Sequence, residues 1–440
     1  MNEILNIIFQ LLIMIVIFSA PLNLITDKNI YKIQILNKQN LYIKLSINIF
    51  FHLNILLIFS FLQISLEKIF YILVFFSTVF NIFYLYDSKI KIDKNFFIYV
   101  IFILAIFLKI AVEPKLEWDG LNHWLAKVNN FFNGTDIYNL KENGFAEYPH
   151  LGPYIWSFFW KNSISQYEYL GRLFYGFFYV TSLFCLIESF FKKKILFLII
   201  IFFTTILTYD HFLFGGYQEY LIFSSLIIIS KIYYTLCLNI KKKVIYNYLL
   251  LIILSQFIIW FKDEALFYYI LFFFIIIFKN NFKYKDKFLL FTIVLIFPII
   301  QYILQFYLIG HYGFQAELIH SSLWENLKPN IFFYKFLLIS KYIFISCIKY
   351  KLWIINIIAI LAIYKFFKKD FIILKPYIYI LALNIILIYG IYFQTPYDIE
   401  FLLKVTLDRL IFQVSGFYLI FPLILIKNLI NKQNYKILTF

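Results

Sequence analysis

The chain alternates long apolar runs with short polar interruptions from one end to the other. Each run is about 20 residues long, the length that a helix needs to cross the hydrocarbon core of a bilayer. This pattern predicts an all-α polytopic membrane protein with about 13 transmembrane helices, within a range of roughly 11 to 14. We expect the spans at 4–20, 46–65, 69–86, 96–112, 170–190, 194–210, 217–237, 246–262, 264–278, 288–309, 352–367, 376–393 and 410–427.

The polar interruptions orient these spans. Lysine-rich loops at 27–44, 88–95, 192–194, 241–243, 279–287 and 365–375, and the basic tail, fall on one side if the N-terminus lies outside. The positive-inside rule makes that side cytoplasmic. The other side then receives the longer loops, above all a large first outer loop at 113–168. With no internal repeat or separate soluble region, residues 1–440 are predicted to form a single integral membrane domain.

The segment 330–351 admits two interpretations. It is apolar enough to span, but four lysines interrupt it. A span there would move the basic loop 365–375 to the outer side, against the positive-inside rule. We therefore favour an amphipathic helix on the outer surface, whose lysine stems lie along apolar surface.

Composition supports the membrane assignment and excludes other classes. The chain is 63% hydrophobic, against about 45–50% for soluble domains. Its net charge of +16 comes from lysines scattered through short loops, which is typical of topology signals and not of a nucleic-acid-binding face. The three cysteines lie in apolar runs without disulfide or metal spacing.

The first outer loop begins with the motif WDGLNHW. If 117–131 is helical, Trp118, Leu121 and two later apolar residues share one face, and Asp119 and His123 lie away from it, four residues apart. This predicts an amphipathic helix in the membrane interface. A second motif, EYPHLGPYIW, contains Tyr148 and Pro149 and predicts a turn into another juxtamembrane helix. The alternatives are an ordinary interfacial helix with a merely solvated polar face for the first motif, and a plain re-entry turn for the second.

Further charges lie at the outer ends of later spans. They are Glu219, then Lys262 and Glu264 between two apolar runs, and Arg409 before the last span. Acidic groups at the edge of the membrane often mark functional cavities. Arginine occurs only twice in this lysine-rich chain, and its planar guanidinium suits a phosphate. The alternative is an ordinary juxtamembrane charge.

The segments WDGLNHW, YPHLGPY, GYQEYLI, KDEAL and DRLIF, in this order over 113–412, resemble the GT-C superfamily of membrane glycosyltransferases. The similar branch contains protein O-mannosyltransferases and lipid A aminoarabinose transferases. Glu219 stands where that branch has Asp, and Asp263 and Ala265 replace Asn and Gly. The resemblance implies transfer of a sugar from a polyprenyl-phosphate donor to a glycan, lipid or protein acceptor, by inversion, on the outer face of a bacterial inner membrane.

The resemblance also implies roles for particular residues. Asp119 would act as the general base on the acceptor hydroxyl, and Lys262 and Arg409 would hold the donor phosphate. The remaining substrate-binding candidates are His123, Tyr148, Pro149, Glu219 and Glu264. No residue is assigned as a metal ligand, although His123, His150 and Glu219 are hypothesised to take a divalent metal.

Two other functions compete with this interpretation. Lipid-linked polysaccharide polymerases and ligases usually place their large outer loop late, whereas here it is early. Transporters tend to show internal repeats and interrupted spans, and this chain has 12 glycines and no repeat. Both patterns favour the glycosyltransferase.

Overall fold

The computed structural model describes residues 2–20, 41–87, 94–134, 136–142, 148–191, 193–238, 245–309, 328–395 and 398–437. Within these ranges the regular structure is helical and contains no strand, which confirms the all-α fold. The principal helices are α1 (Asn2–Ser19), α3 (Leu41–Ser60), α4 (Leu66–Asp87), α5 (Lys94–Val112), α6 (Leu125–Phe132), α7 (Leu151–Lys161), α8 (Tyr169–Ile187), α9 (Lys194–Thr208), α10 (Glu219–Leu238), α11 (Ile245–Ser255), α12 (Asp263–Lys279), α13 (Tyr284–Leu304), α15 (Pro329–Lys349), α16 (Lys351–Phe366), α17 (Lys368–Gln394), α18 (Ile399–Ser415) and α19 (Ile420–Ile437). Short helical turns join them: η1 (Gly120–Trp124), η2 (Ile137–Glu142), η3 (His211–Phe214), η4 (Gln256–Trp260) and η5 (Gln305–Ile309).

Among the described residues, eight helices are long and apolar enough to cross a membrane. They are α3, α4, α5, α8, α10, α13, α15 and α17. A ninth span is obtained if α18 and α19, bent by 43° at their junction, count together. Several other predicted spans correspond to shorter helices, among them α1, α9, α12 and α16. The chain is therefore an integral membrane protein, and the count of about 13 stays a prediction.

Helix α8 forms the centre of the bundle, because every one of its residues is buried. Its Arg172 is 1% exposed and is held by both carboxylate oxygens of Glu168, at 2.7 and 2.9 Å. The same guanidinium donates to the carbonyl oxygens of Pro114 and Phe214. One of the two arginines of the chain thus anchors the start of the first outer loop to the core.

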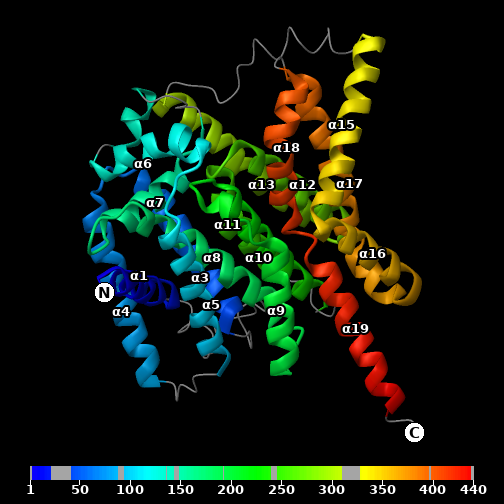
Figure 1. Cartoon of the computed structure of the whole chain (residues 1–440), viewed down its shortest axis with the longest axis horizontal. Helices are drawn as coiled ribbons and strands as arrows, with labels where there is room; N and C mark the ends of the chain where they lie inside the picture. The colour runs from blue at the N-terminus through cyan, green and yellow to red at the C-terminus, as the bar shows by residue number, and fades with distance from the viewer. Residues whose placement is uncertain are drawn as a thin grey trace.

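The segment predicted as the first outer loop contains helices α6 and α7, but the buried face of its first helix differs from the predicted one. Figure 1 shows α6 and α7 at the opposite end of the molecule from the end of α19. Trp118 and Leu121 are exposed, whereas Trp124 and Lys127 are buried. The cause is the π-helical turn η1, whose wider i→i+5 winding shifts the register between the two halves of the helix. The single apolar face predicted for 117–131 is therefore wrong.

The segment predicted at 330–351 folds as α15, a continuous helix of 21 residues that packs against α16, α17 and α18 (Figure 1). Its Lys335 is buried and donates to the carbonyl oxygens of Phe393 and Thr395. Because α15 is also long and apolar enough to span, its placement on the outer surface stays a prediction.

Candidate active site

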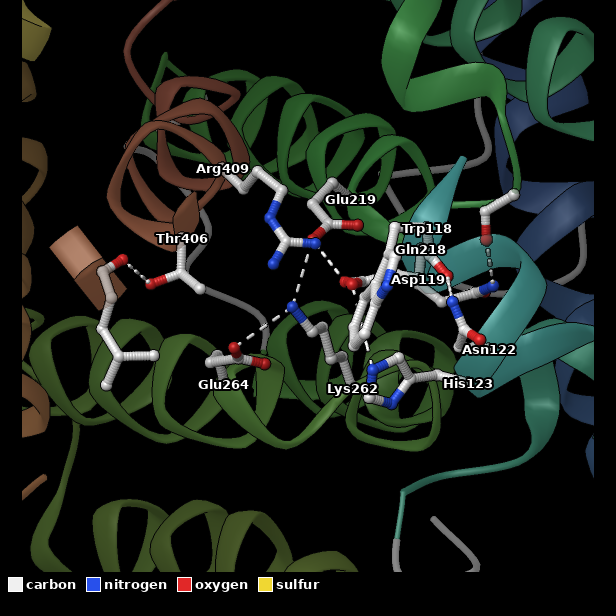
Figure 2. A network of polar contacts seen from close by, with 12 residues as sticks. Trp118, Asp119, Asn122, His123, Gln218, Glu219, Lys262, Glu264, Thr406 and Arg409 are labelled. Atoms are coloured by element: carbon white, nitrogen blue, oxygen red, sulfur yellow. Dashed lines mark hydrogen bonds and ion pairs between the residues drawn. The ribbon is translucent and has the colours of Figure 1, made fainter. Parts of the chain in front are cut away.

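Three carboxylates and two cations meet where four distant segments come together (Figure 2). We call this group the ion cluster. Its members are Asp119 beside η1, Glu219 at the start of α10, Lys262 and Glu264 around the start of α12, and Arg409 in α18. Asp119 and Arg409 are 290 residues apart in sequence. The structure therefore brings together five of the residues that the sequence singled out.

The ion cluster is a continuous chain of ion pairs. Arg409 Nη1 donates to Asp119 Oδ2 and lies 3.6 Å from Glu219 Oε1. Lys262 Nζ donates to the same Glu219 oxygen at 3.1 Å and lies 3.2 Å from Glu264 Oε1. Both cations therefore contact the same oxygen of Glu219. At the two ends of the chain of ion pairs, Asp119 pairs with Arg409 and Glu264 pairs with Lys262.

The cluster is largely buried, with Asp119 and Glu264 the most accessible at 16% and 24% exposed, and its charges depend on one another. Glu219 is 1% exposed, and the side chains of Lys262 and Arg409 are 11% and 12% exposed. Burial alone would lower the pKa of Lys262, but the carboxylates of Glu219 and Glu264 outweigh it and raise that pKa. Since three carboxylates face two cations, the cluster carries one excess negative charge.

Three polar atoms of the cluster have no hydrogen-bond partner within the described part of the chain. They are Glu219 Oε2, Glu264 Oε2 and Arg409 Nε, and all three are buried. Buried polar atoms in folded proteins nearly always have partners. The two carboxylate oxygens can accept and the Arg409 Nε–H can donate, so the cluster has hydrogen-bonding capacity that its own ion pairs do not use.

Close backbone packing positions Asp119 beside Glu219. A Cβ atom on Gly120 would lie 2.2 Å from the carbonyl oxygen of Gly215 and 3.1 Å from Gly216 Cα. The amide of Glu117 also donates to the Gly215 carbonyl at 2.9 Å, and Gly216 has a φ of +99°, a conformation that favours glycine. The glycines of WDGLNHW and GGYQEY therefore allow the two motifs to touch.

Gly120→Ala should destabilise the protein by about 1–3 kcal/mol, because the added methyl group meets backbone and not a movable side chain. The matched control is Gly390→Ala in α17, where an added Cβ meets nothing within 4 Å and alanine favours the helix. Thermal unfolding in detergent compares the two variants. Equal transition temperatures would contradict the packing role of Gly120.

His123 and Tyr148 lie next to the ion cluster. His123 Nε2 is 3.9 Å from Asp119 Oδ1, and its ring packs edge-on against Trp118 and Tyr148. Burial lowers the pKa of His123, although Asp119 opposes the effect. Pro149 is buried in the turn that follows Tyr148 and contributes no charged contact.

Sequence reasoning missed Tyr217, whose ring lies under the Arg409 guanidinium at 4.9 Å from its centroid. An aromatic face stabilises a guanidinium by cation–π attraction. Its place in GGYQEY, two residues before Glu219, was the only available signal.

His150 has a structural environment apart from the ion cluster. Its Nε2 shares a hydrogen bond of 2.8 Å with Ser60 Oγ of α3, and its ring packs against Phe61 and Trp260. Within the described ranges, no group of three or more His, Cys, Asp or Glu side chains is arranged to hold a metal ion. The hypothesised set of His123, His150 and Glu219 is therefore not assembled there.

His150 should make the protein less stable in mild acid. Burial lowers its pKa to about 3, so the unfolded state binds a proton that the folded state does not. The protein therefore has its full stability above the ordinary histidine pKa near 6.5. Below that pH its free energy of unfolding falls by about 1.4 kcal/mol per pH unit until the pH reaches about 3. Between pH 7 and pH 5, the free energy of unfolding should fall in the wild type by about 2 kcal/mol more than it falls in His150→Gln. The same pH dependence in both proteins would contradict this.

Comparisons with family models, with curated proteins and with solved structures each find no match for this chain. The fold and the site define an integral membrane protein with a largely buried ion cluster, formed beside η1, at the starts of α10 and α12, and within α18. The motif resemblance stays a prediction, and support for a function comes from the geometry of that cluster.

Proposed function

We propose that the protein is a glycosyltransferase that moves a sugar from a polyprenyl-phosphate donor to a glycan, lipid or protein acceptor on the non-cytoplasmic face. The observation that carries this proposal is the convergence of Asp119, Glu219, Lys262, Glu264 and Arg409, which come from four of the motifs behind the resemblance, in one buried cluster.

Donor binding would exchange ion pairs. Lys262 and Arg409 are held by carboxylates in this structure, and a phosphate is a competing anion that binds both kinds of cation strongly. When Arg409 turns to the phosphate, Asp119 loses its partner and becomes able to accept a proton. The same binding step would thus hold the donor and prepare the base.

The chemical step is a single displacement. The acceptor hydroxyl oxygen attacks the anomeric carbon from the face opposite the phosphate, which inverts that carbon. The bond from the anomeric carbon to the phosphate oxygen breaks, and polyprenyl phosphate leaves with the electron pair. Asp119 receives the hydroxyl proton. The buried free oxygens of Glu219 and Glu264 would accept hydrogen bonds from sugar hydroxyls.

The direct test is a transfer assay with the full chain in vesicles. Polyprenyl-phosphate sugars labelled in the sugar are offered with a panel of glycan, lipid and peptide acceptors. Release of polyprenyl phosphate together with a labelled product supports the proposal. Failure to bind or consume every such donor contradicts it. Consumption of polyprenyl-diphosphate glycans instead would favour a polymerase or ligase.

The proposed orientation has its own test. In a protein without its partly exposed Cys237 and Cys347, a cysteine at Asn133 should react with an impermeant thiol reagent added to intact cells. A cysteine at Lys194 should react only after permeabilisation, since both residues are exposed and lie in segments predicted on opposite sides. The reverse labelling pattern would invert the topology.

A further inference from the structure

A cavity of about 570 Å³ lies between α3 and α4, away from the ion cluster. Neither helix contributes a residue to the cluster, and Figure 1 places α4 and α18 on opposite sides of the molecule. The walls are almost entirely apolar, with Ile55 and Phe59 from α3 and Leu73 and Phe76 from α4. A volume of this size is typical of sites for small apolar ligands.

His52 is one of two side chains in this lining that carry a polar group. It is 3% exposed, and its Nδ1 lies 2.9 Å from the carbonyl oxygen of Asn48. A carbonyl oxygen only accepts, so Nδ1 carries the proton and a neutral ring keeps the lone pair on Nε2. No hydrogen bond to Nε2 is found within the described residues.

Ser77 of α4 is the other polar side chain of the lining. Its hydroxyl donates to the carbonyl oxygen of Ile17 at 3.2 Å, which leaves only its acceptor capacity for the cavity. Both polar groups therefore offer lone pairs. An anionic headgroup would meet no donor here, whereas a hydroxyl could donate to His52.

The position of the cavity points to a lipid. His52 lies eight residues before Ser60, the last residue of α3, about 12 Å along the helix at 1.5 Å per residue. At that depth a charged group is costly and a neutral one is tolerated. Ile58 and Phe76 of the lining are 59% and 54% exposed, so this side of the cavity faces the lipid chains.

We propose that the cavity binds a long-chain lipid alcohol, whose hydroxyl donates to His52 Nε2 and whose chain packs between α3 and α4. This site is separate from the proposed transfer reaction and does not depend on it.

The test uses the full chain in vesicles and four photoreactive probes, one of which is an alkyl phosphate. A long-chain alkyl alcohol and an isoprenoid alcohol of the same length identify the chain type, and the methyl ether of the better probe lacks the donor. The alcohol should label peptides of α3 and α4 roughly 2- to 10-fold more than its ether, as expected for one neutral hydrogen bond. His52→Phe should reduce the labelling by alcohol to that by ether.

Phe75→Leu is the matched control, because Phe75 is 64% exposed on α4 and lies outside the lining. It should leave the labelling unchanged. Equal labelling by alcohol and ether in the wild type would overturn the proposal, and that comparison needs no variant to fold. Stronger labelling by an alkyl phosphate probe would overturn it as well, since the cavity offers no donor to an anion.

Discussion

Asp119→Asn should lower the rate of sugar transfer by about 10²–10⁴-fold, the usual contribution of a general base. Asparagine has nearly the same shape and can still accept a hydrogen bond from Arg409, the present partner of Asp119. It cannot take up the acceptor proton. The loss should therefore appear in the turnover rate and not in the affinity for the donor. The turnover rate is measured as release of polyprenyl phosphate at saturating donor.

The control for this variant is Asp408→Asn. Asp408 also lies on the predicted outer side, but its carboxylate accepts from Ser346 and Lys349 of α15, outside the ion cluster. Its replacement should leave transfer near the wild-type rate. If wild type and Asp119→Asn released polyprenyl phosphate equally, Asp119 would not be the base.

Lys262→Met should cost about 3–5 kcal/mol of stability, the usual effect of removing one partner of a buried ion pair. Methionine fills much of the same space, so the loss is mainly electrostatic. Glu219, 1% exposed, would keep only Arg409 at 3.6 Å, and the cluster would hold three carboxylates and one cation. Unfolding by denaturant in detergent micelles measures the loss.

A double-mutant cycle separates charge from packing. Adding Glu219→Gln to Lys262→Met returns the cluster to the single excess negative charge of the wild type and should recover a large part of the loss. Lys349→Met is the surface comparison, because the Lys349 side chain is 63% exposed and such pairs contribute about 0–1 kcal/mol. Strictly additive effects of the two cluster substitutions would show that Glu219 and Lys262 are not energetically coupled.

The helical fold and the composition of the ion cluster were predictable from sequence. Spans expected at 170–190 and 217–237 agree closely with α8, Tyr169–Ile187, and α10, Glu219–Leu238, because both are continuous apolar runs with clear ends. The charged residues of the cluster stood out because acidic groups at the edge of the membrane often mark functional cavities and because arginine occurs only twice in the chain.

Other features depend on tertiary structure and left no usable pattern. The π-helical turn η1 changes which face of WDGLNHW is buried. A search for the 3.6-residue period of an α-helix does not detect such a turn, and no residue type signals it. Sequence spacing also could not show which acidic residue each arginine pairs with. Each follows an acidic residue closely, yet Arg172 pairs with Glu168, whereas Arg409 pairs with Asp119 and not with adjacent Asp408.

The link between Asp119 and Arg409 has a consequence for biogenesis. Their separation of 290 residues corresponds to about 15–60 s of synthesis at roughly 5–20 residues per second. During that interval Asp119 exists without its arginine, and Glu219 joins it after the first 100 residues. The charge balance of the site is complete only after α18 is inserted, so a chain that stops before it should be both inactive and a substrate for membrane quality control. Supplying the missing C-terminal segment as a separate polypeptide should restore the pairing.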